Sequence, residues 1–165
     1  VRYPLTSSLT VFAASMAIGA AEETVSLFAE QLQGRVLAGT PGDRSLDKPR
    51  SQARLADATV QLRTAELLWR DGLELLCTVN DRGDRLTVEQ RAWVRLSAVR
   101  GVLAARDAIG TVCDGAGAHV YLDGSPIQRF QRDVESMKGH VVFDVDRASV
   151  LYGRVALGLA PNDMI

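Results

Sequence analysis

The residues with the greatest chemical potential lie in the stretch 115–140, near the end of the chain. A glycine-rich turn opens this stretch, a helical segment follows, and Gly139 comes directly before His140. An imidazole can donate a hydrogen bond to a ligand oxygen or take a proton near neutral pH. Because a glycine weakens a helix, we expect the side chain of His140 to point into a cleft. His140 is therefore the predicted catalytic residue; the alternative is a polar histidine at a helix end.

The glycine-rich turn itself is Gly115-Ala116-Gly117. Such a turn can bring backbone N–H groups close to a phosphate or a cofactor. The alternative is a simple helix C-cap, which is a common use of glycine. We predict cofactor contact at these three residues. His119, beside the turn, is expected to be a surface loop residue.

Composition and spacing exclude several other kinds of function. The net charge of −1 gives no sign of a nucleic-acid or polybasic membrane surface. His119 and His140 are far apart, and the cysteines, Cys77 and Cys113, have no metal-ligand spacing. Both cysteines are expected to be buried free thiols in a reducing compartment. No Ser-His-Asp or phosphate-loop pattern occurs.

The elements that must position these residues all read as helices. Apolar residues recur every three or four positions, which is typical of helices that pack against one another. A chain of 165 residues is one domain by length. The expected fold is all-α: an up-and-down bundle of four main helices plus a C-terminal helix. The expected starts are residue 6, Pro49, a capping box at 87–90, Ser125-Pro126 and a cap at Asp144.

The first helix, expected over 6–33, is apolar nearly all round. Leu9, Phe12 and Met16 belong to one apolar face, and small residues at 19–21 would let a neighbouring helix approach closely. A helix of this kind is expected at the centre of its bundle. We interpret it as a core helix and not as a targeting or membrane-spanning segment.

The pattern after the glycine-rich turn resembles a known family. Pro126, Arg129 and Arg132-Asp133 match the "P-x-x-R-x-x-R-D" pattern that follows a glycine-rich turn in the C-terminal domain of the acyl-CoA dehydrogenase superfamily. In the dehydrogenases a catalytic glutamate follows a little further on, but residues 139–141 contain no carboxylate. The departure favours the flavin-dependent monooxygenase branch, in which a histidine placed near the flavin matches His140.

This resemblance implies a function for the chain. Residues 1–165 would be the C-terminal fragment of a longer flavoenzyme. In that branch a separate reductase supplies reduced flavin (FMN or FAD), oxygen adds to the flavin C4a atom, and the hydroperoxide transfers one oxygen to an aromatic or polycyclic substrate. The resemblance also implies a homo-oligomer, with a tetramer expected, and a cytoplasmic protein that binds neither nucleic acid nor membrane.

Further site residues follow from the same resemblance. Arg35 matches an arginine that contacts flavin across a subunit interface, and the turn at 115–117 can meet the flavin of a neighbouring subunit. Arg129, Arg132 and Asp133 are expected to tie helices together. Two alternatives stay open: an acyl-CoA dehydrogenase-type oxidoreductase, and a non-catalytic helical oligomerisation module.

Overall fold

The computed structural model describes residues 4–34 and 44–165 of the chain, and its main elements are helices. Three short 3-10 helices lie between the longer ones: η1 (Ser45–Asp47), η2 (Ala118–Tyr121) and η3 (Val141–Phe143). The expectation of an all-α bundle with a C-terminal helix is confirmed. The α-helices are α1 (Leu5–Gly34), α2 (Pro49–Asp81), α3 (Val88–Ala116), α4 (Pro126–Lys138) and α5 (Val145–Ala156).

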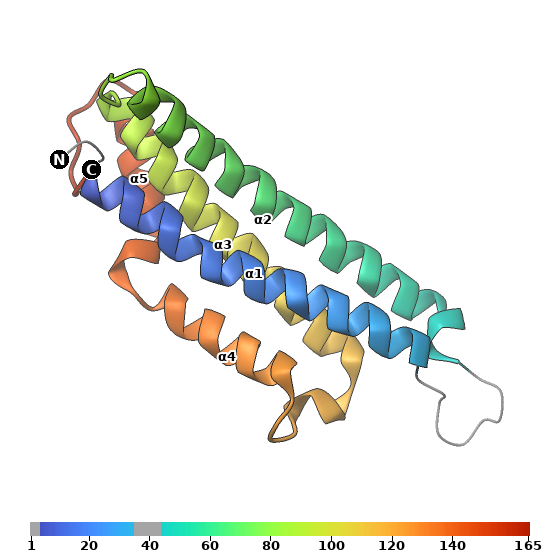
Figure 1. Cartoon of the computed structure of the whole chain (residues 1–165). Helices are drawn as coiled ribbons and strands as arrows, with labels where there is room; N and C mark the ends of the chain where they lie inside the picture. Colours follow the sequence, from blue (N-terminus) through green and yellow to red (C-terminus); the bar gives the residue numbers. More distant parts are fainter. Residues whose placement is uncertain (1–3, 35–43) are drawn as a thin grey trace.

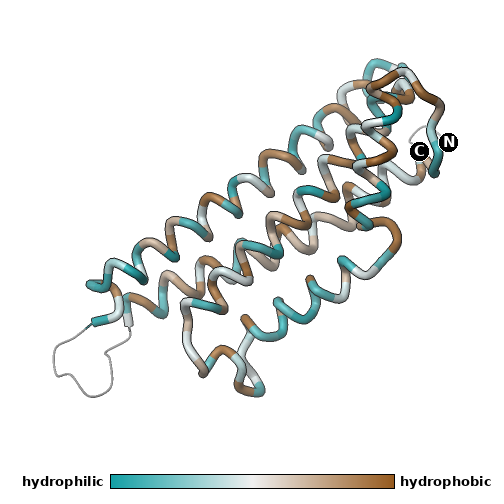
Figure 2. The backbone as a smooth tube through the Cα atoms, turned by 180° about the vertical axis from the view of Figure 1, so that it is seen from behind, coloured by the Kyte–Doolittle hydropathy of each residue, from teal (hydrophilic) through white to brown (hydrophobic). Residues whose placement is uncertain are grey.

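The three long helices α1, α2 and α3 run side by side and form the body of the molecule (Figure 1). The shorter α4 packs against α1 and α3, on the side away from α2 (Figure 1). Helix α5 lies against α3. Apolar and polar segments recur in turn along the long helices (Figure 2). This pattern is typical of helices that are buried on one side. The loop that carries His140 therefore lies where α4 and α5 meet the long helices.

Two of the expected helix caps are present, and one is not. At the start of α3, Gln90 N–H donates to Thr87 Oγ1 at 3.1 Å and Thr87 N–H donates to Gln90 Oε1 at 2.9 Å, which is a capping box. Asp144 caps α5 by accepting a hydrogen bond from Arg147 N–H at 3.0 Å. Ser125 occupies the N-cap position of α4, but its hydroxyl makes no capping hydrogen bond.

Helix α1 was expected to be central because it is apolar nearly all round, but one of its apolar faces is exposed. Leu9, Phe12 and Met16 are 50%, 60% and 62% exposed. The buried face is the neighbouring one, which is richer in small residues; it includes Val11, Ala14, Ala17, Ile18, Ala21, Val25 and Phe28. A helix that is apolar all round does not itself specify which face packs, and here the small residues allow the closer approach to α3.

Helix α1 is also long and apolar enough to cross a membrane, by length and composition alone. The core helix of a globular bundle meets the same criterion. Its contacts here are with α2, α3 and α4, as expected for a bundle helix.

Glycine does provide close helix contacts, although not where we expected. Gly19 is exposed, and a Cβ at this position would have no other atom within 4 Å. At Gly115, a Cβ would lie 2.9 Å from the ring carbon Cζ of Phe28 and 3.4 Å from the Cβ of Arg54. Gly115 thus allows the end of α3 to pack directly against α1 and α2.

Gly115→Ala is expected to destabilise the bundle. The ring of Phe28 is fully buried and cannot move aside easily, so overpacking should cost about 1–3 kcal/mol. This outweighs the gain of about 1 kcal/mol from replacing a helical glycine by alanine. The matched control is Gly110→Ala in the same helix, where an added Cβ would have no atom of the surrounding structure within 4 Å. Urea unfolding should show a loss for the first variant only; equal stability of both variants would contradict this packing role.

The chain turns back after α5. Gly158 has φ +74°, a conformation that favours glycine, and it follows the C-cap residue Leu157 of α5. Leu159 lies beyond the helix and is 50% exposed. Arg154 Nε donates to the carbonyl of Ala160 at 3.1 Å and holds the returning segment.

Candidate functional site

His140 lies at the junction between α4 and η3. Helix α4 ends at Lys138, and the N–H of His140 donates to the carbonyl of Met137 at 3.0 Å. The side chain is exposed, and it borders two hollows of the surface. Because α4 ends before His140, Asp133 and His140 do not share a helical face. Asp133 therefore does not orient the imidazole.

One hydrogen bond determines which nitrogen of the imidazole can donate to a ligand. Val142 N–H donates to His140 Nδ1 at 3.2 Å. In a neutral imidazole, one nitrogen accepts and the other carries the proton. Nδ1 is the acceptor, so Nε2 carries the proton and can donate a hydrogen bond to a ligand oxygen.

An apolar groove lies between the N-terminal half of α1 and the end of α4. Its volume is about 450 Å³, within the range of small-molecule sites. We call it the His140 groove. It is lined by Leu9, Ala13 and Met16 of α1, by Ser136 and Met137 of α4, and by His140, Val142 and Phe143.

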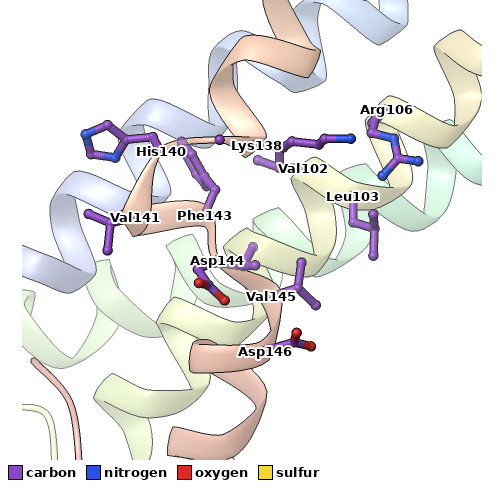
Figure 3. Close-up of a pocket in the computed structure, with 12 residues that line it drawn as sticks. Val102, Leu103, Arg106, Lys138, His140, Val141, Phe143, Asp144, Val145 and Asp146 are labelled. Atoms are coloured by element: carbon purple, nitrogen blue, oxygen red, sulfur yellow. The ribbon is translucent and has the colours of Figure 1, made fainter.

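A second, charged hollow of about 270 Å³ lies between α3 and the start of α5. Figure 3 shows that the imidazole of His140 points away from Lys138 and Arg106 of this hollow. Both cations are engaged by Glu135: Arg106 Nε lies 3.1 Å from its Oε1, and Lys138 Nζ lies 2.6 Å from its Oε2. The pair of Arg106 and Glu135 links α3 to α4, the pair of Lys138 and Glu135 lies within α4, and neither surrounds the imidazole.

The glycine-rich turn mostly belongs to a helix. Gly115 and Ala116 lie in the last turn of α3, and Ala116 is buried. At the C-terminal end of a helix, backbone N–H groups bond within the helix and the carbonyls face outward. Gly117 is the C-cap, with φ +86°, and its carbonyl accepts from Val120 N–H at 3.1 Å. This turn is thus a helix end in which Gly115 also serves packing.

The glycine-rich turn at residues 115–117 and His140 do not come together in one chain. The charged hollow beside the His140 loop meets α3 at residues 99–106. Gly115 lies about 14 Å further along α3 than Arg106, at 1.5 Å per residue. Arg35 lies outside the described residues. The described residues therefore do not by themselves form a pocket that fits a flavin, and flavin contact at these positions stays a prediction.

The other histidine has a partner that the sequence did not indicate. His119 lies in η2 and is half-buried, and its Nε2 contacts the side-chain amide Nε2 of Gln31 of α1. Gln31 and His119 are 88 positions apart, and only the packing of η2 against the end of α1 joins them. A small hollow beside them is lined by Leu122 and Ile127, among others.

The arginines of the "P-x-x-R-x-x-R-D" pattern lie on the exposed side of α4. Arg129 lies over the ring of Phe130, with its guanidinium carbon 5.5 Å from the centroid. Within the part of the chain that the structure describes, neither Arg132 nor Asp133 forms an ion pair with another helix. The expected ties between helices are made elsewhere, by Arg106 with Glu135 and by Arg54 with Asp114 at 3.5 Å.

The two cysteines differ in burial. Cys113 is buried and Cys77 is half-buried, and both are free thiols. Burial, helped by the charge of Asp114, raises the pKa of Cys113 to about 11, so this thiol stays protonated near neutral pH. Over residues 4–34 and 44–165, no three His, Cys, Asp or Glu side chains lie together as metal ligands would.

Comparison with known proteins defines the class of this domain. The profile of the family described as "acyl-CoA dehydrogenase, C-terminal domain" matches residues 11–145. The chain belongs to this family, which confirms the resemblance seen in residues 126–133.

Three relatives match most of the length of this chain. The oxygenase subunit HsaA of a flavin-dependent monooxygenase from Mycobacterium tuberculosis is 30% identical over 152 residues, covering 88% of this chain and 37% of the relative. HsaA from Rhodococcus jostii is 30% identical over 167 residues, covering 98% and 41%. The oxygenase component of p-hydroxyphenylacetate 3-hydroxylase from Acinetobacter baumannii is 27% identical over 152 residues, covering 90% and 35%. The chain thus spans well under half the length of these relatives.

Solved structures support the fold. XiaF from a Streptomyces species, in complex with FADH2 and glycerol, superposes with a TM-score of 0.89 at 22% identity, covering 96% of this chain and 40% of that one. HsaA from M. tuberculosis gives a TM-score of 0.85 at 24% identity, covering 96% and 40%.

Proposed function

We propose that this bundle is the C-terminal domain of the oxygenase component of a two-component flavin-dependent monooxygenase that hydroxylates an aromatic or polycyclic substrate. The relatives support this, since they are named as oxygenase subunits of such systems. The observation that carries it is the position of His140, an exposed imidazole beside an apolar groove. A separate reductase would supply the reduced flavin, and oxygen would be the co-substrate.

The surroundings of His140 disfavour the dehydrogenase alternative. Removal of a substrate proton by a dehydrogenase requires a carboxylate base near this position. Glu135 is ion-paired with Arg106 and Lys138, and Asp144 is engaged as the cap of α5. Neither carboxylate is available as a base beside the groove.

The part played by this chain is to place a hydrogen-bond donor. The flavin, when bound, supplies the oxygen-activating chemistry, and the remainder of its pocket must come from outside the described residues. His140 Nε2 can donate to an oxygen of the substrate, while its Nδ1 is held by the N–H of Val142. The bond to Val142 sets the orientation of the ring, and the apolar groove lies beside it.

The activity itself can be tested in a full-length oxygenase that carries this bundle. Reduced FMN or FAD, oxygen and a phenol should give a hydroxylated product when a reductase regenerates the flavin. Oxidation of an acyl-CoA thioester in its place would overturn the proposal in favour of the dehydrogenase type.

The 165-residue chain alone is expected to bind flavin weakly. The predicted contacts at residues 115–117 lie at the end of α3, away from His140, and a few backbone groups cannot replace an enclosed pocket. Titration of reduced FMN or FAD under anaerobic conditions should show little binding in calorimetry. Submicromolar affinity would mean that the chain holds a complete flavin site elsewhere.

We also propose that the domain forms a cytoplasmic homo-oligomer, with a tetramer expected. Large apolar side chains are exposed on two of the long helices: Leu5 and Phe12 of α1 are 78% and 60% exposed, and Val60 and Leu67 of α2 are 65% and 68% exposed. Such surfaces are characteristic of protein interfaces. Light scattering at micromolar concentration should show an assembly; a monomer would contradict this.

A further inference from the structure

We infer that the His140 groove is the seat of an uncharged, flat ring system of the substrate, a phenol of two or more fused rings, and that Met16 and Met137 form its walls. This inference rests on the proposed function and adds the substrate class to it. It also gives a role to two exposed apolar residues of α1, Leu9 and Met16, which the packing of the bundle does not explain.

The chemistry of the lining points to a ring. Thioether sulfurs make favourable contacts with aromatic rings, and methionine adapts its shape to flat ligands. Met16 comes from α1 and Met137 from α4, so the two side chains reach the groove from different helices. Phe143 is 5% exposed and supplies a rigid, aromatic part of the lining. Burying apolar surface of a ligand here is favourable in proportion to the area removed from water.

The charges argue for an uncharged substrate. None of the groove-lining residues is Asp, Glu, Lys or Arg. The nearby cations, Arg106 and Lys138, are paired with Glu135 and lie away from the imidazole (Figure 3). A substrate carboxylate placed in this groove would lose its water without gaining an ion pair, which is costly. The groove offers two polar groups: the imidazole of His140, which can donate, and the hydroxyl of Ser136, which donates to the carbonyl of Arg132 at 2.9 Å and can still accept. One donor and one acceptor suit a single phenol hydroxyl.

The three methionines of the chain provide a direct test that needs no flavin. Met16 and Met137 line the groove, whereas Met164 is not among its residues and is 64% exposed. In the 165-residue chain labelled with ¹³C at the methionine methyl groups, 2-naphthol should shift the signals of Met16 and Met137 and leave that of Met164 unchanged. The probe 6-hydroxy-2-naphthoate, which has the same rings plus a carboxylate, should bind at least about tenfold more weakly.

Two variants distinguish binding in the groove from nonspecific binding elsewhere on the surface. Ala13→Phe places a ring inside the groove and should weaken 2-naphthol binding about tenfold or more. Ala53→Phe on the exposed side of α2 is the matched control and should change nothing. If Ala13→Phe does not fold, as judged by circular dichroism, Met16→Gln serves in its place. That substitution alters a side chain that is 62% exposed, and it should weaken binding by making the wall polar.

Several results would overturn the inference. Equal shifts at all three methionines, equal binding of the two naphthalene probes, or an unchanged affinity in both groove variants would each do so. A signal of Met16 that shifts with protein concentration in the absence of a probe would show that a second copy covers the groove. The proposed function fails separately, if a full-length oxygenase gives no hydroxylated product while the groove still binds 2-naphthol.

Discussion

His140→Ala in a full-length oxygenase that carries this bundle is expected to lower productive hydroxylation by roughly 10²–10⁴-fold, the range for the loss of a positioned acid–base group or donor. The variant should fold, since the side chain is exposed and the hydrogen bond that its Nδ1 accepts from Val142 N–H is local. Reduced flavin should still be consumed by oxygen. Hydroxylated product and released hydrogen peroxide, each measured per flavin oxidised, should therefore shift from product towards peroxide.

The second histidine provides the control for this experiment. His119→Ala removes an imidazole that contacts Gln31, away from the His140 groove, and it should leave the ratio of product to peroxide unchanged. His140→Asn keeps a short side chain with both a donor and an acceptor, so it should retain more product than His140→Ala if donation is the role of His140. Full coupling in His140→Ala would make His140 a helix-end residue without a catalytic role.

Asp163→Asn is expected to destabilise the fold by about 2–3 kcal/mol, because it leaves a buried guanidinium without its counter-charge. The guanidinium belongs to Arg95 of α3, which is 3% exposed, and its Nη1 lies 3.1 Å from Asp163 Oδ2. The carbonyl of Met164, 2.8 Å from the same nitrogen, remains as an acceptor and limits the loss. Chemical denaturation monitored by circular dichroism would measure it.

The control for this variant is Arg147→Gln. Arg147 also bonds Asp163, at 2.6 Å, but its side chain is 44% exposed, so water can replace the bond and the loss should be much smaller. Equal losses in the two variants would show that the buried position of Arg95 is not what makes Asp163 important.

Acid should weaken the same contact. The hydrogen bond from Arg147 lowers the pKa of Asp163 in the folded state, and the charge of Arg95 acts in the same direction. A carboxyl with a lowered folded-state pKa stabilises the fold above its unfolded pKa of about 3.9. This stabilisation is lost as the pH falls below that value and through the folded-state pKa. The difference in stability between wild type and Asp163→Asn should therefore be full at pH 6 and shrink below about pH 4.

Local signals in the sequence were sufficient for the helices and for several of their ends. The capping box at Thr87 and Gln90 and the cap at Asp144 involve residues three positions apart, so the pattern of residue types already contains the interaction. The same holds for the break before His140, since Gly139 and His140 are neighbours. The family was also evident from the sequence, because the order and spacing of Pro126, Arg129 and Asp133 are properties of the linear chain.

Which faces of the helices are buried was decided by tertiary structure. Helix α1 has apolar residues all round, so its hydrophobic pattern did not distinguish the face of Ala14 and Ile18, which packs, from that of Phe12 and Met16, which is exposed. The packing density between α1, α2 and α3 makes the choice, because the face with small residues permits the closest approach. The packing role of Gly115 was also decided by tertiary structure. Only the position of Phe28, which is far away in the sequence, shows that a side chain at residue 115 would clash.

One residue of the candidate site, His140, was proposed from the sequence, and the groove beside it is assembled only by the fold. His140 could be singled out from its neighbours in the chain, but the groove beside it is lined by residues from both ends of the sequence, such as Leu9 and Met137. The contact between Gln31 and His119 and the bond between Arg95 and Asp163 likewise join distant segments. A pattern in the linear sequence indicates interactions between residues that are only a few positions apart. Contacts between distant segments depend on how whole helices are placed, and that placement results from the packing of all the buried faces together.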